Sequence, residues 1–101
     1  MSGVAYEVRV TLDPLRGEAF ERWMLDHHVP KVLDTGCFSA ARFERLAPGA
    51  YRTRYDATSP ADLERYLAEH AAALRGDFTA RFGEGAAVSR ETWTTLGSWP
   101  R

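Results

Sequence analysis

The sequence lacks several features that would assign it to a class of protein. It has one cysteine, Cys37, among 101 residues, so no disulfide can form within the chain. No apolar run approaches the roughly 20 residues that a membrane-spanning helix needs. The chain starts without a basic segment followed by an apolar one, so we expect no signal peptide and a cytoplasmic location. These absences argue against a disulfide-stapled secreted domain and against a helical membrane protein.

An excess of charge of one sign is also missing. The chain has 13 Lys and Arg residues against 14 Asp and Glu residues, which leaves a formal net charge of −1. Without a positive excess there is no electrostatic basis for binding nucleic acid or an anionic membrane. Hydrophobic residues make up 45% of the chain, an ordinary globular proportion. The length predicts one domain over residues 1–101, small enough that pairing with a second copy would bury useful apolar surface.

Hydrophobic periodicity predicts four strands and two helices in the order β-α-β-β-α-β. Helix starts are indicated at Asp13-Pro14 and Ser59-Pro60, where a capping side chain precedes a proline. Pro30 is expected to kink or restart the first helix, because proline lacks an N–H group. The strands are expected over residues 4–12, 37–46, 50–58 and 86–96. This order is typical of an α+β, ferredoxin-like fold, a four-stranded antiparallel sheet with both helices on one face.

The sheet face opposite the helices is predicted to be rich in arginine. Arg9 and Arg54 alternate with residues expected to face the helices, among them Tyr55. Arg42 lies on a strand of uncertain phase, since a slip of one residue exchanges it with Phe43. Trp93 is a further candidate for this face. We consider two interpretations: a solvated face with ion pairs, or two subunits that pair through it and enclose a polar cavity.

Three histidines could carry chemistry. Helical periodicity places His27 in the middle of the apolar stripe of the first helix, and His28 at its edge. His70 lies within the stripe of the second helix. The simpler interpretation is a half-buried histidine held by a hydrogen bond, and the functional one is a general acid or base at the rim of the open face.

Metal and thiol chemistry are not indicated. The three histidines and one cysteine match no metal motif, so we predict no metal and no other cofactor. Cys37 has no base beside it in the sequence and is expected to be a buried thiol. The catalytic candidates are His28 and Tyr55. The predicted ligand-binding residues are Arg9, His28, Arg42, Arg54, Tyr55 and His70.

Several blocks of the sequence together resemble a known family. They include Trp23-Met24, His28-Val29-Pro30, Thr35-Gly36-Cys37-Phe38 and Asp62-Leu63-Glu64-Arg65-Tyr66-Leu67. Over most of its length the chain resembles domain of unknown function 4286, a bacterial family. The resemblance implies a ferredoxin-like fold that pairs as a dimeric α/β barrel, the architecture of many small cofactor-free monooxygenases, lactone isomerases and polyketide cyclases. It brings no established activity and no catalytic residues, and its pattern includes His28 rather than His27.

Three functions remain open at this point, in this order of preference. The first is a homodimeric protein that binds a small acidic or aromatic ligand on the open face, because guanidinium groups suit acids. The second is a cofactor-free isomerase, cyclase or monooxygenase, with His28 as acid or base and Tyr55 or Arg54 steadying a negative oxygen. The third is a protein-interaction module that uses the open face and Trp99, a tail residue that packs either on a partner or on its own domain.

Overall fold

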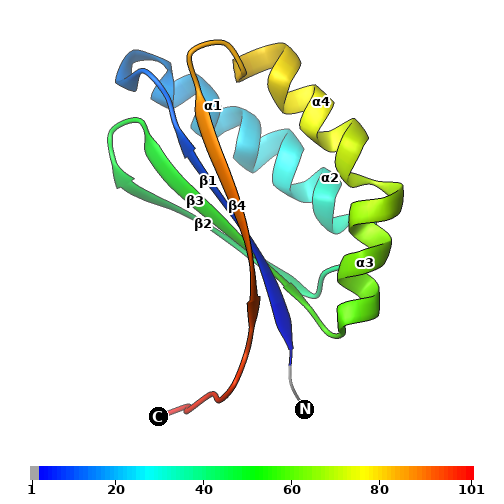
Figure 1. Cartoon of the computed structure of the whole chain (residues 1–101). Helices are drawn as coiled ribbons and strands as arrows, with labels where there is room; N and C mark the ends of the chain where they lie inside the picture. The colour runs from blue at the N-terminus through cyan, green and yellow to red at the C-terminus, as the bar shows by residue number, and fades with distance from the viewer. Residues whose placement is uncertain (1–2) are drawn as a thin grey trace.

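A four-stranded antiparallel sheet carries all the helices on one of its faces (Figure 1). The computed structural model describes residues 3–101. The strands β1 (Val4–Thr11), β2 (Ala40–Ala47), β3 (Ala50–Ala57) and β4 (Ala87–Thr94) lie in the order β2-β3-β1-β4. The predicted ferredoxin-like α+β fold is confirmed. The second strand starts at Ala40 rather than Cys37, because Cys37 and Phe38 turn into the core before it.

The helical layer consists of two stretches of chain. The first contains η1 (Pro14–Arg16), α1 (Gly17–Trp23), the π-helical turn η2 (Met24–His28) and α2 (Val29–Leu33), and the second contains α3 (Pro60–Glu69) and α4 (Ala71–Phe82). No helix within residues 3–101 is long and apolar enough to cross a membrane.

Both predicted helix starts are confirmed. The Asp13 side chain accepts a hydrogen bond from the Leu15 N–H at 2.9 Å, and the Ser59 side chain accepts one from the Asp62 N–H at 3.3 Å. The helical path runs on through Pro30, which occupies the first turn of α2, where its missing N–H costs little. The second stretch is interrupted at His70, whose φ of −124° lies outside the helical range.

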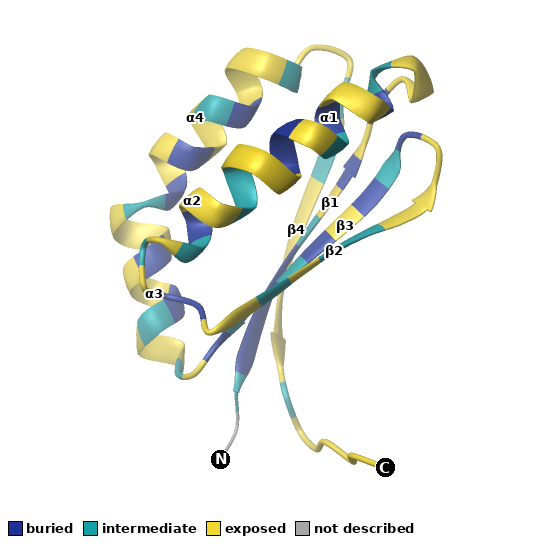
Figure 2. Ribbon diagram, turned by 180° about the vertical axis from the view of Figure 1, so that it is seen from behind, coloured by how far each residue is buried: buried dark blue, intermediate teal, exposed yellow. Residues whose placement is uncertain are grey.

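Strand alternation decides which side chains meet the helices. The buried residues of β3 are Tyr51, Thr53, Tyr55 and Ala57, and they stand beside inward residues of β1 such as Tyr6 and Val8 (Figure 2). Phe43 packs edge-on against Phe20 under the helices, with ring centroids 6.0 Å apart, so of the two phases left open for this strand the one with Arg42 on the open face is observed. Trp93, the other candidate for the open face, does lie there: it pairs with Ala5 of β1 and is 44% exposed.

The core under the helices forms two aromatic clusters. One surrounds Tyr6, Phe38, Tyr55 and Tyr66, and Cys37 lies buried in it as expected. The other surrounds Phe20, Trp23, Tyr51 and Phe78. Two half-buried residues, Val8 and Val29, pack against both clusters and join them. A boundary between two clusters is where packing is most easily left incomplete.

The chain after β4 leaves the body of the molecule (Figure 1). Trp99 is 86% exposed and Leu96 is 97% exposed. The interpretation in which Trp99 packs on its own domain is therefore wrong. Docking of this residue on a partner stays a prediction.

The turn between β2 and β3 is expected to depend on Gly49. Its φ is +83°, and a Cβ atom there would run into the Leu12 carbonyl oxygen, while Gly85 has a φ of +75° with nothing within 4 Å. Gly85→Ala should therefore cost about 1 kcal/mol of unfolding free energy from its backbone conformation alone. Gly49→Ala should cost distinctly more, because the backbone must also move. Urea unfolding of the two variants tests this, and equal midpoints would contradict it.

Candidate functional site

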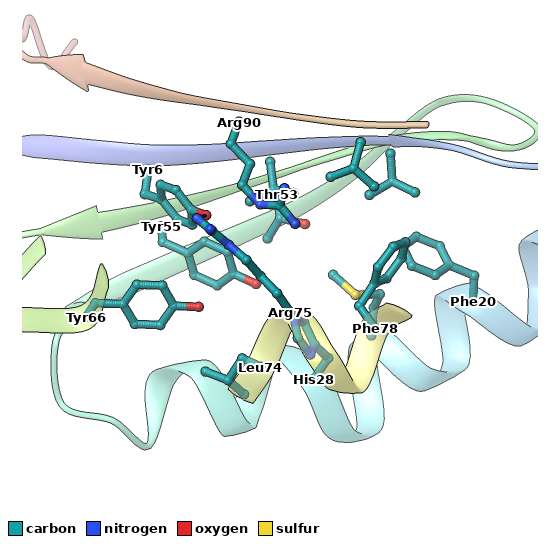
Figure 3. Close-up of a pocket in the computed structure, with 14 residues that line it drawn as sticks. Tyr6, Phe20, His28, Thr53, Tyr55, Tyr66, Leu74, Arg75, Phe78 and Arg90 are labelled. Atoms are coloured by element: carbon teal, nitrogen blue, oxygen red, sulfur yellow. Dashed lines mark hydrogen bonds between the residues drawn. The ribbon is translucent and has the colours of Figure 1, made fainter. Parts of the chain in front are cut away.

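An inner pocket lies between the sheet and the helices, where the two aromatic clusters meet (Figure 3). Its volume of about 40 Å³ has room for a few water molecules. Its walls are mostly apolar and come from both clusters. The polar residues that line it are Tyr6, Thr53 and Tyr55 from the inner strands, Arg90 from β4, Tyr66 and Arg75 from the second helical stretch, and His28 from the π turn.

The π turn places His28 in this pocket. The Val29 N–H donates to the carbonyl of Met24, five residues earlier, so this turn contains one residue more than an α-helical turn. The side chains that follow are rotated about the helix axis by that extra residue. His28 thereby takes the inward direction that uniform α-helical periodicity gives to His27, and His27 is exposed. The prediction that His27 lies deeper than His28 is wrong for this reason.

The surroundings of His28 keep its ring neutral. The ring stacks on Trp23, with centroids 4.6 Å apart and planes 23° from parallel. Burial lowers the pKa of His28 from 6.5 to about 4; the Asp77 charge opposes this decrease, and the Lys31 charge adds to it. Nδ1 is completely buried, with no hydrogen-bond partner in the described part of the chain. Leaving such an atom unpaired costs roughly 1–3 kcal/mol, which a bound group could recover.

Of the three tyrosines in the pocket, Tyr55 and Tyr66 are protonated at neutral pH. Burial, with smaller contributions from Tyr66 and Tyr6, raises the pKa of Tyr55 well above its usual value of 10.0. Burial likewise raises the pKa of Tyr66 to about 12. Each phenol is therefore a hydrogen-bond donor that can also accept. The labelled side chains of all three tyrosines point toward the same space in Figure 3.

Two arginines complete the pocket. Arg75 and Arg90 are exposed residues that nevertheless line it, so they mark its opening to solvent. Arg75 donates from Nη2 to the hydroxyl of Tyr6 at 2.8 Å. No pattern in the sequence indicates Arg75 as a pocket residue, because an arginine on the polar side of a helix is usually solvated. Arg90 could have been selected, because it stands two residues after Val88 on the side of β4 that faces the helices.

No group of three or more His, Cys, Asp or Glu side chains within residues 3–101 is arranged to hold a metal ion. The chemistry that the pocket offers is that of phenols, guanidinium groups and one neutral imidazole.

A family model matches residues 3–96 of the sequence. The chain belongs to DUF4286, a domain of unknown function. No curated protein has a sequence that matches it.

Solved structures share the fold of this DUF4286 chain at low sequence identity. The monooxygenase from the gene ActVA-Orf6 of Streptomyces coelicolor, solved with the ligand nanaomycin D, has a TM-score of 0.77 and 16% identity, with 98% of this chain and 92% of that one covered. NE2512, a protein of unknown function from Nitrosomonas europaea, has a TM-score of 0.75 and 17% identity, with 100% of this chain and 96% of that one covered. SnoaB, a cofactor-independent oxygenase from Streptomyces nogalater, has a TM-score of 0.69 and 16% identity, covering 100% of both chains.

The six residues that the sequence selected for this DUF4286 chain lie in three places. His28 and Tyr55 meet in the inner pocket. His70 is half-buried and lines an outer hollow between the helices with Thr35 and Asp77. Arg9 and Arg54 lie on the open face, as alternation predicted, and Arg42, whose phase the sequence left open, lies there too. The sheet therefore separates these three arginines from His28, and they cannot share one site with it.

The open face carries ion pairs between side chains of this chain. Arg9 pairs with Glu7 at 3.0 Å and Arg54 with Asp56 at 3.3 Å, each within one strand. Arg52 pairs with Glu44 across β2 and β3 at 2.9 Å. These arginines are thus partly neutralised by their own neighbours. That two copies pair through this face stays a prediction.

The depressed pKa of His28 predicts a loss of stability in mild acid. The unfolded chain takes up a proton near pH 6.5, whereas the folded chain resists it until about pH 4. The contribution of His28 to stability is complete above pH 6.5 and falls by up to roughly 3 kcal/mol as the pH drops to 4. His28→Gln should remove this pH dependence from the free energy of unfolding, measured with urea between pH 6.5 and pH 4. His27→Gln, at the exposed neighbour, is the control and should keep it. Identical slopes in all three proteins would contradict the assignment.

Proposed function

We propose that the protein binds a small organic molecule in the inner pocket. The observation that carries this proposal is the convergence of His28, with its unpaired Nδ1, and the hydroxyls of Tyr55 and Tyr66 on one mostly apolar cavity. Apolar walls with a few convergent polar groups are typical of small-molecule sites. Two proteins of the same fold support it: one is a monooxygenase solved with nanaomycin D and the other a cofactor-independent oxygenase.

The inner pocket is a better candidate than the open face on charge grounds. Arg9, Arg52 and Arg54 each have a carboxylate of this chain within 3.3 Å. A ligand on the open face would have to compete with those carboxylates. His28, which lines the inner pocket, has no hydrogen-bond partner for its Nδ1 atom within residues 3–101.

Ligand binding requires some movement at the opening. A cavity of about 40 Å³ does not hold a drug-sized molecule, since such sites commonly measure roughly 300–1,000 Å³. Arg75 and Arg90 are the lining side chains that can move at least cost, because both are long and exposed. Their displacement would enlarge the pocket without disturbing the buried tyrosines.

A second candidate function is cofactor-free proton transfer on the bound molecule. The observation that favours it is the neutral state of His28, which leaves one ring nitrogen free to accept a proton at neutral pH. With a pKa of about 4 the ring alone is a weak base, but an anion formed beside it would stabilise the imidazolium. The protonated phenol of Tyr55 lines the same cavity and can donate a hydrogen bond to that anion.

Binding in the inner pocket can be tested with 4-nitrophenol, a small aromatic acid whose absorbance reports its ionisation. Tyr55→Phe should weaken binding about fivefold, as expected for one lost hydrogen bond worth about 1 kcal/mol. Arg54→Ala is the matched control, because it changes the adjacent residue of β3 on the opposite face of the sheet. Titration calorimetry should find its affinity unchanged. The reverse pattern, with only Arg54→Ala weakened, would move the ligand to the open face.

Proton transfer can be tested by hydrogen exchange on 2-tetralone, an aromatic ketone with acidic C–H groups. The protein in D₂O should accelerate deuterium incorporation, followed by proton NMR. His28→Gln should reduce the acceleration at least 100-fold, within the range for a lost general base of about 10²–10⁴. His27→Gln should leave it intact. An unchanged rate in His28→Gln would remove this histidine from the reaction.

A further inference from the structure

We propose that Arg75 and Arg90 form an anion-binding site at the opening of the inner pocket, so that the ligand carries a carboxylate or phenolate group. This inference rests on the proposed ligand binding and specifies the class of ligand. Its basis is the position, charge and incomplete hydrogen bonding of these two arginines.

Arg75 reaches from the helical layer to the sheet. It lies on α4, and its Nη2 atom contacts the hydroxyl of Tyr6 on β1 at 2.8 Å (Figure 3). Tyr6 is only 4% exposed, so the guanidinium group of this exposed arginine reaches into the pocket with at least its Nη2 atom. The Tyr6 hydroxyl accepts from one of the five N–H donors of the Arg75 guanidinium. Arg75 makes no other hydrogen bond to a described side chain.

Arg90 approaches the same region from the opposite wall. It stands on β4, and its side chain points into the pocket in Figure 3. The charges of Arg75 and Arg90 both act to lower the pKa of Tyr66, against the larger effect of burial. Both guanidinium groups therefore lie close enough to the phenol of Tyr66 to influence its ionisation.

The two positive charges are not compensated by this chain. None of the salt bridges formed by described residues includes Arg75 or Arg90. The acidic residue nearest to Arg75 in the sequence of α4, Asp77, pairs instead with Lys31 at 3.0 Å. Two guanidinium groups at one opening repel each other, and an anion between them relieves that repulsion.

The arrangement matches an elongated amphipathic molecule. Its apolar part would fill the space beside Val8, Val10 and Phe78, and its carboxylate or phenolate group would face the arginines. A carboxylate accepts hydrogen bonds from a guanidinium in a bidentate manner, which a neutral Tyr6 hydroxyl cannot do. Arg75 would thus exchange Tyr6 for the ligand as the molecule enters.

The test compares 1-naphthoate with 1-naphthamide, which have similar shape and differ in charge. We expect the wild-type protein to bind naphthoate at least tenfold more tightly, by titration calorimetry at low salt. Arg75→Gln and Arg90→Gln should each lower the naphthoate affinity enough to remove most of this preference, with a much smaller change in the naphthamide affinity. Arg75→Lys should keep part of it. Arg52→Gln, on the open face, is the control and should keep all of it.

The outcomes separate this inference from the proposed function. If both compounds bind equally to the wild-type protein and Tyr55→Phe weakens both, the pocket is a ligand site and the anion site is wrong. If neither compound binds, both proposals are wrong. If Arg52→Gln removes the preference and Arg75→Gln does not, the anion is bound on the other face of the sheet. Circular dichroism of each variant identifies any that do not fold, and Arg90→Gln tests the same site independently of Arg75.

Discussion

Strict alternation along β1 and β3 is the constraint on which the rest of this structure depends. Neighbouring residues on these strands face opposite sides of one sheet, so Tyr55 belongs to the pocket while Arg54 belongs to the open face. The chain thereby keeps two groups of polar side chains apart. In the group on the open face, Arg9 and Arg54 are partly neutralised by carboxylates of their own strands. The polar side chains under the helices face an apolar cavity, where hydrogen bonds are stronger and unpaired groups are more costly.

Much of the fold could be predicted because its signals are local. The apolar alternation of β1 predicts a strand, and Asp13 and Ser59 predict helix starts, each from neighbouring residues alone. The folded chain has the same strand and the same helix starts. The phase of β2 could not be fixed locally, since either Arg42 or Phe43 could have faced the helices. Only contact with Phe20, on another element, decides between the two phases.

The site was harder to predict than the fold for two physical reasons. The first is the π turn, which adds one residue to a helix whose uniform periodicity places His27 inward; the family resemblance included His28 without giving a cause. The second is reach, since Arg75 starts on the outer part of a helix and its long side chain ends on β1. Sequence periodicity describes where a side chain leaves the backbone and contains no information on where a flexible one ends. Tyr55 lies in the inner pocket, whereas the arginines with which it was associated lie behind the sheet.

The position of β4 in the sheet affects how the pocket can change shape. This strand lies at the edge and is hydrogen-bonded on one side only, to β1, yet it supplies Val88 and Arg90 to the pocket. The edge strand β4 can bend outward and strain only its hydrogen bonds to β1. A shift of β1 would strain its hydrogen bonds to both β3 and β4. The pocket can therefore change its volume while β1 and β3 stay hydrogen-bonded to each other. In an evolving family, the β4 wall could change its residues to suit new molecules while the β1–β3 half of the sheet keeps the fold intact.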